Sequence, residues 1–144
     1  GVRLAARALE VHSEHLNVLL HAAGALFALT NACGENRKEA AELNLPDRLF
    51  AVLAAHPDRQ ELVAYCLWVL LALLQHDGEG AVLRAALAPD RVRQIEIVRT
   101  RNHNNEEIRN AADEIFEKFV DENIFYDEVE IEEAIKLGQA QGAL

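Results

Sequence analysis

The sequence has no methionine, only one tryptophan and three prolines among its 144 residues. Without methionine, Gly1 is not an initiator residue, and we expect these residues to be part of a longer protein. The prolines Pro46, Pro57 and Pro89 lie between runs of helix-forming residues, where a helix can begin but cannot continue. They separate the segments of a chain that is otherwise predicted to be helical.

Long hydrophobic runs and glycosylation signals are also missing. The longest apolar run, residues 62 to 74, covers thirteen positions, whereas a membrane-spanning helix needs about 20. Cys33 and Cys66 lie in apolar helical context, and no Asn-X-Ser/Thr sequence occurs. We therefore expect two small buried cysteines in a cytoplasmic protein that does not insert into a membrane.

Positive charge is scarce, with 14 Lys and Arg against 24 Asp and Glu and a net charge of −10. Nucleic acids and anionic membranes are bound through Lys and Arg that displace counterions, so this balance argues against both as partners. The acid is local, since residues 113 to 133 hold ten carboxylates and one lysine. We expect the arginines between residues 84 and 109 to pair with the chain's own carboxylates.

Helical segments follow one another with turn residues between them. Residues 3 to 12 form the first helix and 14 to 33 the second, with Ser13 as its N-cap and Gly34 at its C-terminal end. Asn44 can adopt the left-handed conformation that ends a helix. Further helices are predicted over residues 35 to 43, 47 to 55, about 59 to 75, 81 to 88, from 89 onward, 106 to 120, and 127 to 137.

These segments repeat along the sequence. Pro46-Asp47-Arg48 and Pro89-Asp90-Arg91 are the same tripeptide, and each opens a helix after a short preceding one. Landmarks of the three long helices also match: Ala23, Leu26 and Phe27 align with Ala64, Leu67 and Trp68, and these align with Ala112, Ile115 and Phe116. In this alignment equivalent positions differ by 41 and then by 48. Periods of about 40 to 47 residues, built from two or three helices, are typical of α-solenoids.

We therefore predict an all-α protein, a right-handed α-solenoid of about three repeats. Residues 1–34 form an incomplete first repeat, 35–77 the central repeat, 78–120 a C-terminal capping repeat, and 121–144 an acidic C-terminal helix and tail. The helix at 62–74 is apolar all round and is expected to be sandwiched, whereas the helix at 106–120 has one apolar side and is expected at an end. The helix at 3–12 lacks a preceding unit and is expected to leave apolar surface uncovered.

Residues 35 to 75 resemble an armadillo repeat, whose spacing HEAT repeats share. Glu35-Asn36-Arg37 opens the first helix, Asn44 stands where that family usually has glycine, and Ala64-Tyr65-Cys66-Leu67 falls in the third helix. The resemblance implies stacked three-helix repeats with a partner-binding groove lined by the third helices. It also implies a groove position for Trp and, four residues on, for an Asn that clamps a peptide. The residues at those positions are Gly24 and Ala28, Tyr65 and Val69, and Asp113 and Glu117, so the Asn is absent.

A stripe of small or polar residues predicts where a partner binds. On the second helix it recurs at spacings of 4, 3, 4 and 3: Asn17, His21, Gly24, Ala28 and Asn31. The same alignment carries it to Leu62, Tyr65 and Val69, and then to Asn110, Asp113 and Glu117. In a stack, these residues form one concave surface that runs from amide and imidazole groups across an apolar strip to carboxylates. A basic amphipathic helix fits such a surface.

Two interpretations of this surface remain open. Either a partner binds there, or the chain's own tail beyond Val120 folds over Tyr65 and Val69. Trp68, aligned with Phe27 and Phe116, is expected in the core. No residue pattern indicates a metal site or catalysis, because the histidines at 12, 15 and 21 do not share a helix face and the acidic cluster has no Gly-rich turns.

We therefore expect a non-enzymatic protein-interaction module without a cofactor, within a larger cytoplasmic protein. Its expected partner is a protein or peptide, with a basic amphipathic helix as one form, and not a nucleic acid. The alternatives are a regulatory or structural repeat segment of a multidomain enzyme, or of a cytoskeletal or chaperone assembly.

Overall fold

The computed structural model describes residues 1–75, 88–121 and 136. Within these ranges the chain forms seven α-helices and no strand, which confirms the all-α class. The predicted helix at 81–88, nearly all of the one at 127–137, the connector at 77–80 and the tail after 137 lie outside the described residues.

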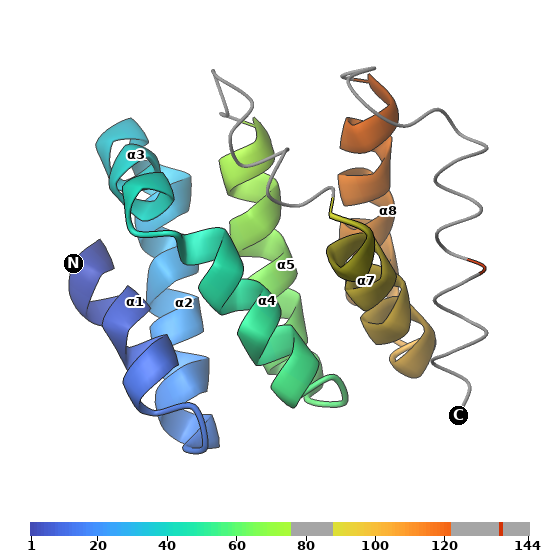
Figure 1. The fold of residues 1–144 in the computed structure, drawn as a ribbon, viewed down its shortest axis with the longest axis horizontal. Coiled ribbons are helices and arrows are strands. Elements are labelled where there is room, and N and C mark those ends of the chain that lie inside the picture. The colour runs from blue at the N-terminus through green and yellow to red at the C-terminus, as the bar shows by residue number, and fades with distance from the viewer. Residues whose placement is uncertain (76–87, 122–135, 137–144) are drawn as a thin grey trace.

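Six of the helices form three antiparallel pairs arranged in two layers (Figure 1). The first pair is α1 (Val2–Val11) and α2 (Leu16–Ala32), the second is α4 (Leu45–Ala55) and α5 (Gln60–Gln75), and the third is α7 (Pro89–Arg101) and α8 (Glu106–Asp121). The inner layer contains α2, α5 and α8 side by side, and the outer layer contains α1, α4 and α7. The short helix α3 (Gly34–Glu42) connects the first pair to the second and packs on both.

The turns inside the three pairs have the same backbone hydrogen bonds. The backbone N–H of His12 donates to the carbonyl of Ala8 at 3.0 Å, and the N–H groups of His56 and Asn102 likewise donate four residues back. Each of these residues begins a four-residue turn, at 12–15, 56–59 and 102–105, whose last N–H donates to the carbonyl of its first residue. The numbers of equivalent positions in successive pairs therefore differ by 44 and then by 46.

This spacing corrects the alignment of the long helices. The predicted shifts of 41 and 48 become 44 and 46, because each inner helix starts directly after its turn. Phe27 is consequently not equivalent to Trp68, although their rings do pack together with centroids 5.4 Å apart. The loop predicted at residues 102 to 105 and the helix start at Pro89 are confirmed.

Most helix boundaries lie within a few residues of their predicted positions. Asn44 is confirmed as left-handed, with φ 56°, and α4 begins directly after it, two residues before the predicted Asp47. Two predicted helix ends are wrong. The N-cap of α2 is His15 and not Ser13, since residues 12 to 15 form the turn. Gly34 is the first residue of α3, because the break after α2 is made by extended backbone at Cys33.

The core runs between the two layers, and α5 lies at its centre. Almost every residue of α5 from Leu62 to Leu74 is buried, because the helix packs on α2, α3, α4 and α8. The prediction that this all-apolar helix is sandwiched is confirmed. Cys66 is buried as predicted, and Cys33 is half-buried.

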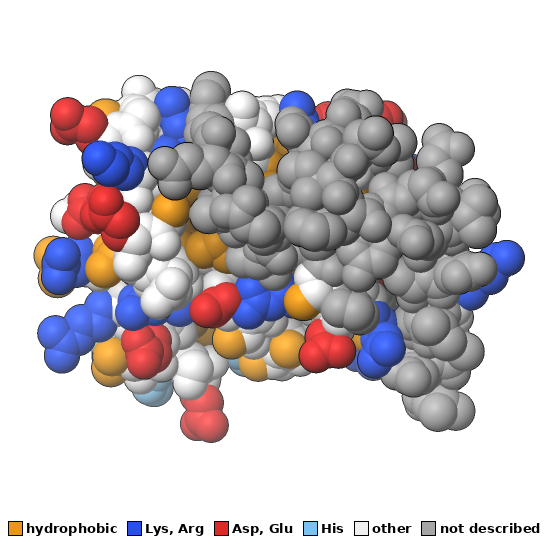
Figure 2. Space-filling model, turned by 45° about the horizontal axis from the view of Figure 1, so that its top comes forward, with side chains coloured by type: hydrophobic (Ala, Val, Ile, Leu, Met, Phe, Trp, Pro, Cys, Tyr) orange, Lys and Arg blue, Asp and Glu red, His pale blue; other side chains and the backbone are white. Residues whose placement is uncertain are grey.

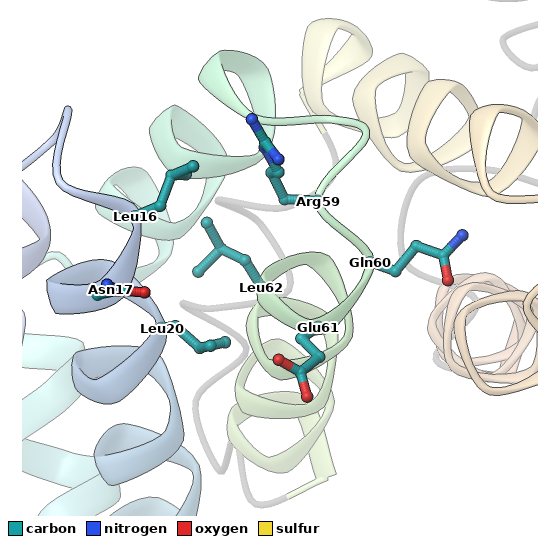
Figure 3. A pocket seen from close by; sticks show the side chains of 7 residues that line it. All are labelled: Leu16, Asn17, Leu20, Arg59, Gln60, Glu61 and Leu62. Atoms are coloured by element: carbon teal, nitrogen blue, oxygen red, sulfur yellow. The ribbon is translucent and has the colours of Figure 1, made fainter.

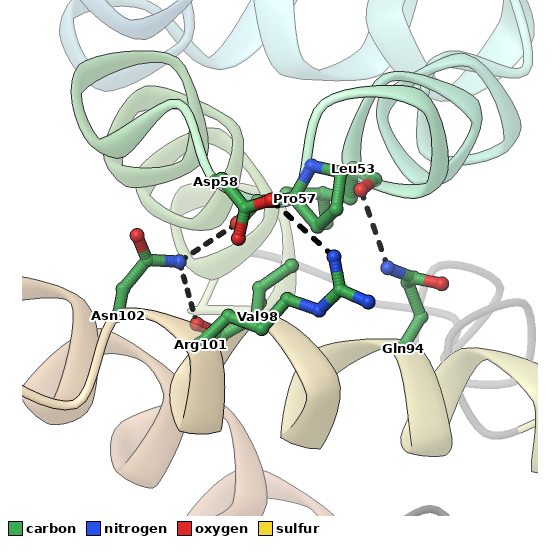
Figure 4. A network of polar contacts seen from close by, with 7 residues as sticks. All are labelled: Leu53, Pro57, Asp58, Gln94, Val98, Arg101 and Asn102. Carbon is green, nitrogen blue, oxygen red and sulfur yellow. Dashed lines mark hydrogen bonds and ion pairs between the residues drawn. The ribbon is translucent and has the colours of Figure 1, made fainter. Parts of the chain in front are cut away.

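Polar contacts between the pairs repeat as well. The ring Nε2 of His56 lies 2.9 Å from the carbonyl of Ser13, and the side-chain amide of Asn102 donates to the carbonyl of Pro57 at 2.8 Å. His56 and Asn102 hold equivalent positions, as do Ser13 and Pro57. The second of these contacts is drawn in Figure 4, together with hydrogen bonds from Gln94 and Arg101 to the second pair.

The predicted pairing of the arginines with the chain's own carboxylates is confirmed for three of them. Arg91 pairs with Asp47, Arg101 with Asp58 and Arg99 with Asp113. The ion pairs of Arg91 and Arg101 join the second helix pair to the third, and the ion pair of Arg99 joins α7 to α8.

Candidate functional site

The turn spacing identifies one row of side chains across the inner layer, which we call the inner row. It contains the predicted stripe on α2 and its equivalents on α5 and α8. The members are Asn17, His21, Gly24, Ala28 and Asn31 on α2; Glu61, Tyr65, Trp68, Ala72 and Gln75 on α5; and Glu107, Ala111, Glu114 and Lys118 on α8. All but Ala72 and Ala111 are exposed or half-buried. On α5, which is otherwise buried from residue 62 to residue 74, Tyr65 and Trp68 alone are half-buried.

Aromatic rings occupy the middle of the inner row. Tyr65 and Trp68 pack edge to face with ring centroids 5.6 Å apart, and Phe27 of α2 lies 6.1 and 5.4 Å from them. Gly24 faces this group, and a Cβ at that position would lie 3.6 Å from the Tyr65 ring, in ordinary van der Waals contact. The result is an aromatic surface between α2 and α5 that is only partly buried.

Carboxylates belong to the same row as these rings. Glu61 is exposed in the first turn of α5, and Glu107 and Glu114 are exposed on α8. Lys118 is the one basic member of the inner row. The row therefore combines partly accessible aromatic area with net negative charge, a combination that attracts a cationic partner with an apolar side.

The predicted residues on α2 are accessible. Asn17, His21 and Asn31 are exposed on one side of the helix. Tyr65 of α5 is half-buried and belongs to the same row.

Leu62 and Val69, in contrast, are 3 % and 0 % exposed and offer no surface to a partner. They were assigned to the groove by the alignment of Ala23 with Ala64. With the corrected shift of 44, they are equivalent to Val18 and Ala25 of α2, and so lie on the side of α5 that faces the first pair. The predicted apolar strip of Leu62, Tyr65 and Val69 is therefore corrected to Tyr65 and Trp68.

Asn110, Asp113 and Glu117 are exposed but lie on another side of α8. The residues equivalent to Gly24 and Ala28 are Glu114 and Lys118, one position further along the helix, and one residue of helix is a rotation of about 100°. Asp113 accepts hydrogen bonds from Arg99 at 2.9 and 3.4 Å. This pairing raises the pKa of the Arg99 guanidinium, and it already neutralises the carboxylate that was predicted to bind a partner.

A small pocket opens at the N-terminal ends of α2 and α5 (Figure 3). It has a volume of about 250 Å³. Leu16, Leu20 and Leu62 form its apolar part, and the polar residues around it include two members of the inner row, Asn17 and Glu61. Its volume is below the range of about 300–1,000 Å³ that is usual for small-molecule sites, so we treat it as a depression at one end of the row.

Other chemistry finds little support in the described ranges. No group of three or more His, Cys, Asp or Glu side chains is close enough there to hold a metal ion. Burial raises the pKa of the Cys66 thiol to about 12, so this group is a poor nucleophile at neutral pH. No helix of the part described is long and apolar enough to cross a membrane.

The sequence analysis did not assign Glu61, Trp68, Glu107 and Glu114 to the binding surface, and Trp68, expected in the core, packs against the core but is only half-buried. The signal that could have found them lies in the turns. His12 and His56 each directly follow a helix, and in both cases the next helix begins four positions later. The apolar α5 has no polar stripe that indicates its rotation. Aligning Trp68 with Phe27 displaced the predicted register of α5 by three residues, which is almost one helical turn.

Together, the fold and the inner row define a class of protein: an all-helical stack of repeated helix pairs with a mixed aromatic and acidic face. Comparison with known proteins adds no narrower assignment, because no protein-family model, curated protein or solved structure matches the chain.

Proposed function

We propose that this chain is a non-enzymatic protein-interaction module, an armadillo-like α-solenoid segment that binds a helix or peptide of a protein partner along the inner row. The observation that carries the proposal is the half-buried pair Tyr65 and Trp68 in the same row as the exposed Glu61, Glu107 and Glu114. Aromatic residues are enriched where proteins bind one another, because they contribute a large contact area at little cost in side-chain entropy.

The partner that fits is a basic amphipathic helix or peptide. Its apolar side packs on Tyr65 and Trp68, and its Lys or Arg side chains pair with Glu114 and with the acids nearest to it. A guanidinium over a tyrosine or tryptophan ring contributes about 0.5–2 kcal/mol more, depending on how far it is desolvated. A cytoplasmic setting belongs to this proposal, and the free Cys33 and Cys66 support it.

The armadillo resemblance is used here only for its groove position. Counted from Gly24 with the corrected spacing, the position at which peptide-binding members carry Trp corresponds to Trp68 on α5, and the clamping position four residues on corresponds to Ala72. The proposal therefore includes packing on the tryptophan, and it does not include a side-chain clamp on the partner's backbone.

Trp68 is the single tryptophan of the chain, so the tryptophan fluorescence of the protein comes from the inner row alone. We propose to titrate the protein with an 18-residue helical peptide of leucine and lysine, and with a matched peptide of leucine and glutamate. The expected result is a saturable change in tryptophan fluorescence with the lysine peptide, weakened by salt, and none with the glutamate peptide. Equal responses to both peptides, or no response to either, contradict the proposal.

A further inference from the structure

The pocket between the first and second helix pairs has walls of leucine. Leu16 and Leu20 of α2 are half-buried, and Leu62 of α5, which is 3 % exposed, closes the floor (Figure 3). An apolar cavity of roughly 150 Å³ takes up a benzene ring, so the pocket volume of about 250 Å³ gives room for one leucine or phenylalanine side chain. The pocket therefore has the size of a site for a single apolar side chain.

The stack itself does not require leucine at these positions. At the next interface, between α5 and α8, the residue equivalent to Leu16 is Gln60, and its side-chain oxygen accepts a hydrogen bond from the amide of Asn105 at 3.2 Å. The residue equivalent to Leu20 is Ala64. A polar contact thus joins the second interface at the place where the first interface has an apolar pocket.

The pocket differs from the most exposed apolar side chains because two helices of the stack shape it. The sequence predicts uncovered apolar surface on the first helix, and Leu4 and Val11 of α1 are 73 % and 59 % exposed. In Figure 1, α1 lies at one end of the stack, and at that end of the face drawn in Figure 2 hydrophobic side chains reach the surface among charges of both signs. These are scattered side chains at an end, whereas α2 and α5 together form the pocket.

The pocket is continuous with the inner row, since Asn17 and Glu61 belong to both. Tyr65 follows Glu61 by four residues and Trp68 follows it by seven, which places the aromatic pair about 6 to 10.5 Å further along α5. A helix that lies along α2 and α5 and packs on Trp68 therefore reaches the pocket with a side chain seven positions away in its own sequence.

The charges around the pocket favour an apolar side chain that has a basic neighbour. Arg59 and Glu61 are exposed and lie on opposite sides of Leu62 in Figure 3, so the pocket has no excess charge of its own. A charged side chain that enters it loses hydration and gains little in return. Glu61, as a member of the inner row, is available to pair with a Lys or Arg of the partner.

We infer that this pocket is the anchor site for one leucine-sized side chain of the partner, a basic amphipathic helix that lies along α2 and α5 and packs a second apolar side chain on Trp68. The inference rests on the proposed function, because it assigns the position and the spacing of two contact residues in the partner proposed there. Leu16 and Leu20 supply the surface that the anchor covers, and a few anchors buried in such pockets carry most of the affinity of an interface.

Two peptides of identical composition test the spacing. Both are 18-residue helical peptides of alanine and lysine with two leucines, which are seven positions apart in the first peptide and nine positions apart in the second. Leucines seven apart lie on the same side of a helix, about 10.5 Å from each other, whereas leucines nine apart lie on opposite sides. Calorimetric titration of the full chain is expected to show about tenfold tighter binding of the first peptide, because only this peptide buries both leucines.

A matched pair of variants on α2 tests the pocket itself. Leu20 and Leu29 are both half-buried leucines that pack against the core, but only Leu20 lines the pocket. In Leu20→Asn the advantage of the first peptide is expected to fall below about twofold, because the anchor then meets a polar wall. Leu29→Asn is expected to keep the tenfold difference. Unchanged helical circular dichroism in both variants separates a lost contact from lost folding.

The possible failures are distinguishable. If the parent binds both peptides equally, or if the two variants change the difference equally, the anchor pocket is wrong while the binding of a basic helix stands. If neither peptide binds the parent, the proposed function fails and the anchor site fails with it.

Discussion

Single polar side chains join the helix pairs at their turns. Asn102 is 2 % exposed, and its amide donates to the carbonyl of Pro57 at 2.8 Å and to that of Val98 at 2.7 Å. A buried carbonyl that loses such a donor costs about 1–3 kcal/mol. His56 makes the equivalent contact to Ser13 with an imidazole nitrogen at 2.9 Å. Residues of different chemistry thus perform the same task at equivalent positions.

We predict that Asn102→Ala lowers the free energy of unfolding by about 1–3 kcal/mol, measured by urea denaturation. Asn104, which is exposed in the same turn, provides the control, and Asn104→Ala is expected to change stability by less than about 0.5 kcal/mol. Equal losses in the two variants would show that the turn as a whole, and not the Asn102 amide, joins the second and third pairs.

The Cys66 thiol gives the protein a pH dependence in the alkaline range. Its pKa is raised from 9.0 to about 12 by burial, so the unfolded chain ionises first as the pH rises. The stability that the protonated Cys66 thiol contributes to the folded state is complete below pH 9 and is lost progressively up to about pH 12. The free energy of unfolding then falls by up to about 1.4 kcal/mol per pH unit. We predict that the difference in unfolding free energy between the parent and Cys66→Ala narrows over this range. A difference that stays constant with pH contradicts the burial of this thiol.

At the scale of helices, α2 contains a helix-weakening residue that the space around it does not require. Gly24 lies inside the helix, opposite the Tyr65 ring, and an added Cβ meets the ring at 3.6 Å, which is ordinary van der Waals contact. The glycine is therefore not required by space at the size of alanine.

We predict that Gly24→Ala raises the free energy of unfolding by about 0.5–1 kcal/mol, because alanine loses less backbone entropy than glycine in a helix. The reverse change at the next position, Ala25→Gly, is expected to lower it by a similar amount. Urea denaturation of both variants checks the prediction. A loss of stability in Gly24→Ala would mean that the Tyr65 ring lies closer to α2 than this structure has it.

The presence and approximate position of the helices could be predicted from the sequence, because capping residues, prolines and the spacing of apolar residues are signals within a few neighbouring residues. Asn44 is an example, since its left-handed backbone separates α3 from α4 as the sequence indicated. The end of α2 was predicted less well, because Cys33 makes the break with extended backbone before Gly34 is reached.

The rotation of α5 could not be predicted in the same way. A helix that is apolar on every side has no polar face, so its sequence does not indicate which side faces which neighbour. Its rotation about its own axis is set by the contacts that surround it in the fold. The turns at 12–15 and 56–59 fix that rotation through backbone hydrogen bonds. The half-buried Tyr65 was predicted on the inner row, whereas Trp68 was expected in the core and Leu62 on the surface.

At the scale of the whole molecule, repetition of one interface creates the inner row. Stacked pairs cover the same side of α5 and α8. The same stacking places the equivalent positions Gly24, Trp68 and Glu114 next to one another along the inner row. The row thus follows from the spacing of the turns at 12–15, 56–59 and 102–105.

The most direct test of this account compares two exposed glutamates three positions apart on α8. Glu114 belongs to the inner row, and Glu117 belongs to the row that the sequence alignment predicted. Binding of the leucine and lysine peptide is followed by Trp68 fluorescence in Glu114→Lys and Glu117→Lys. The account predicts at least a fivefold weaker affinity for Glu114→Lys and less than a twofold change for Glu117→Lys. The opposite order, or equal losses in both variants, would contradict it.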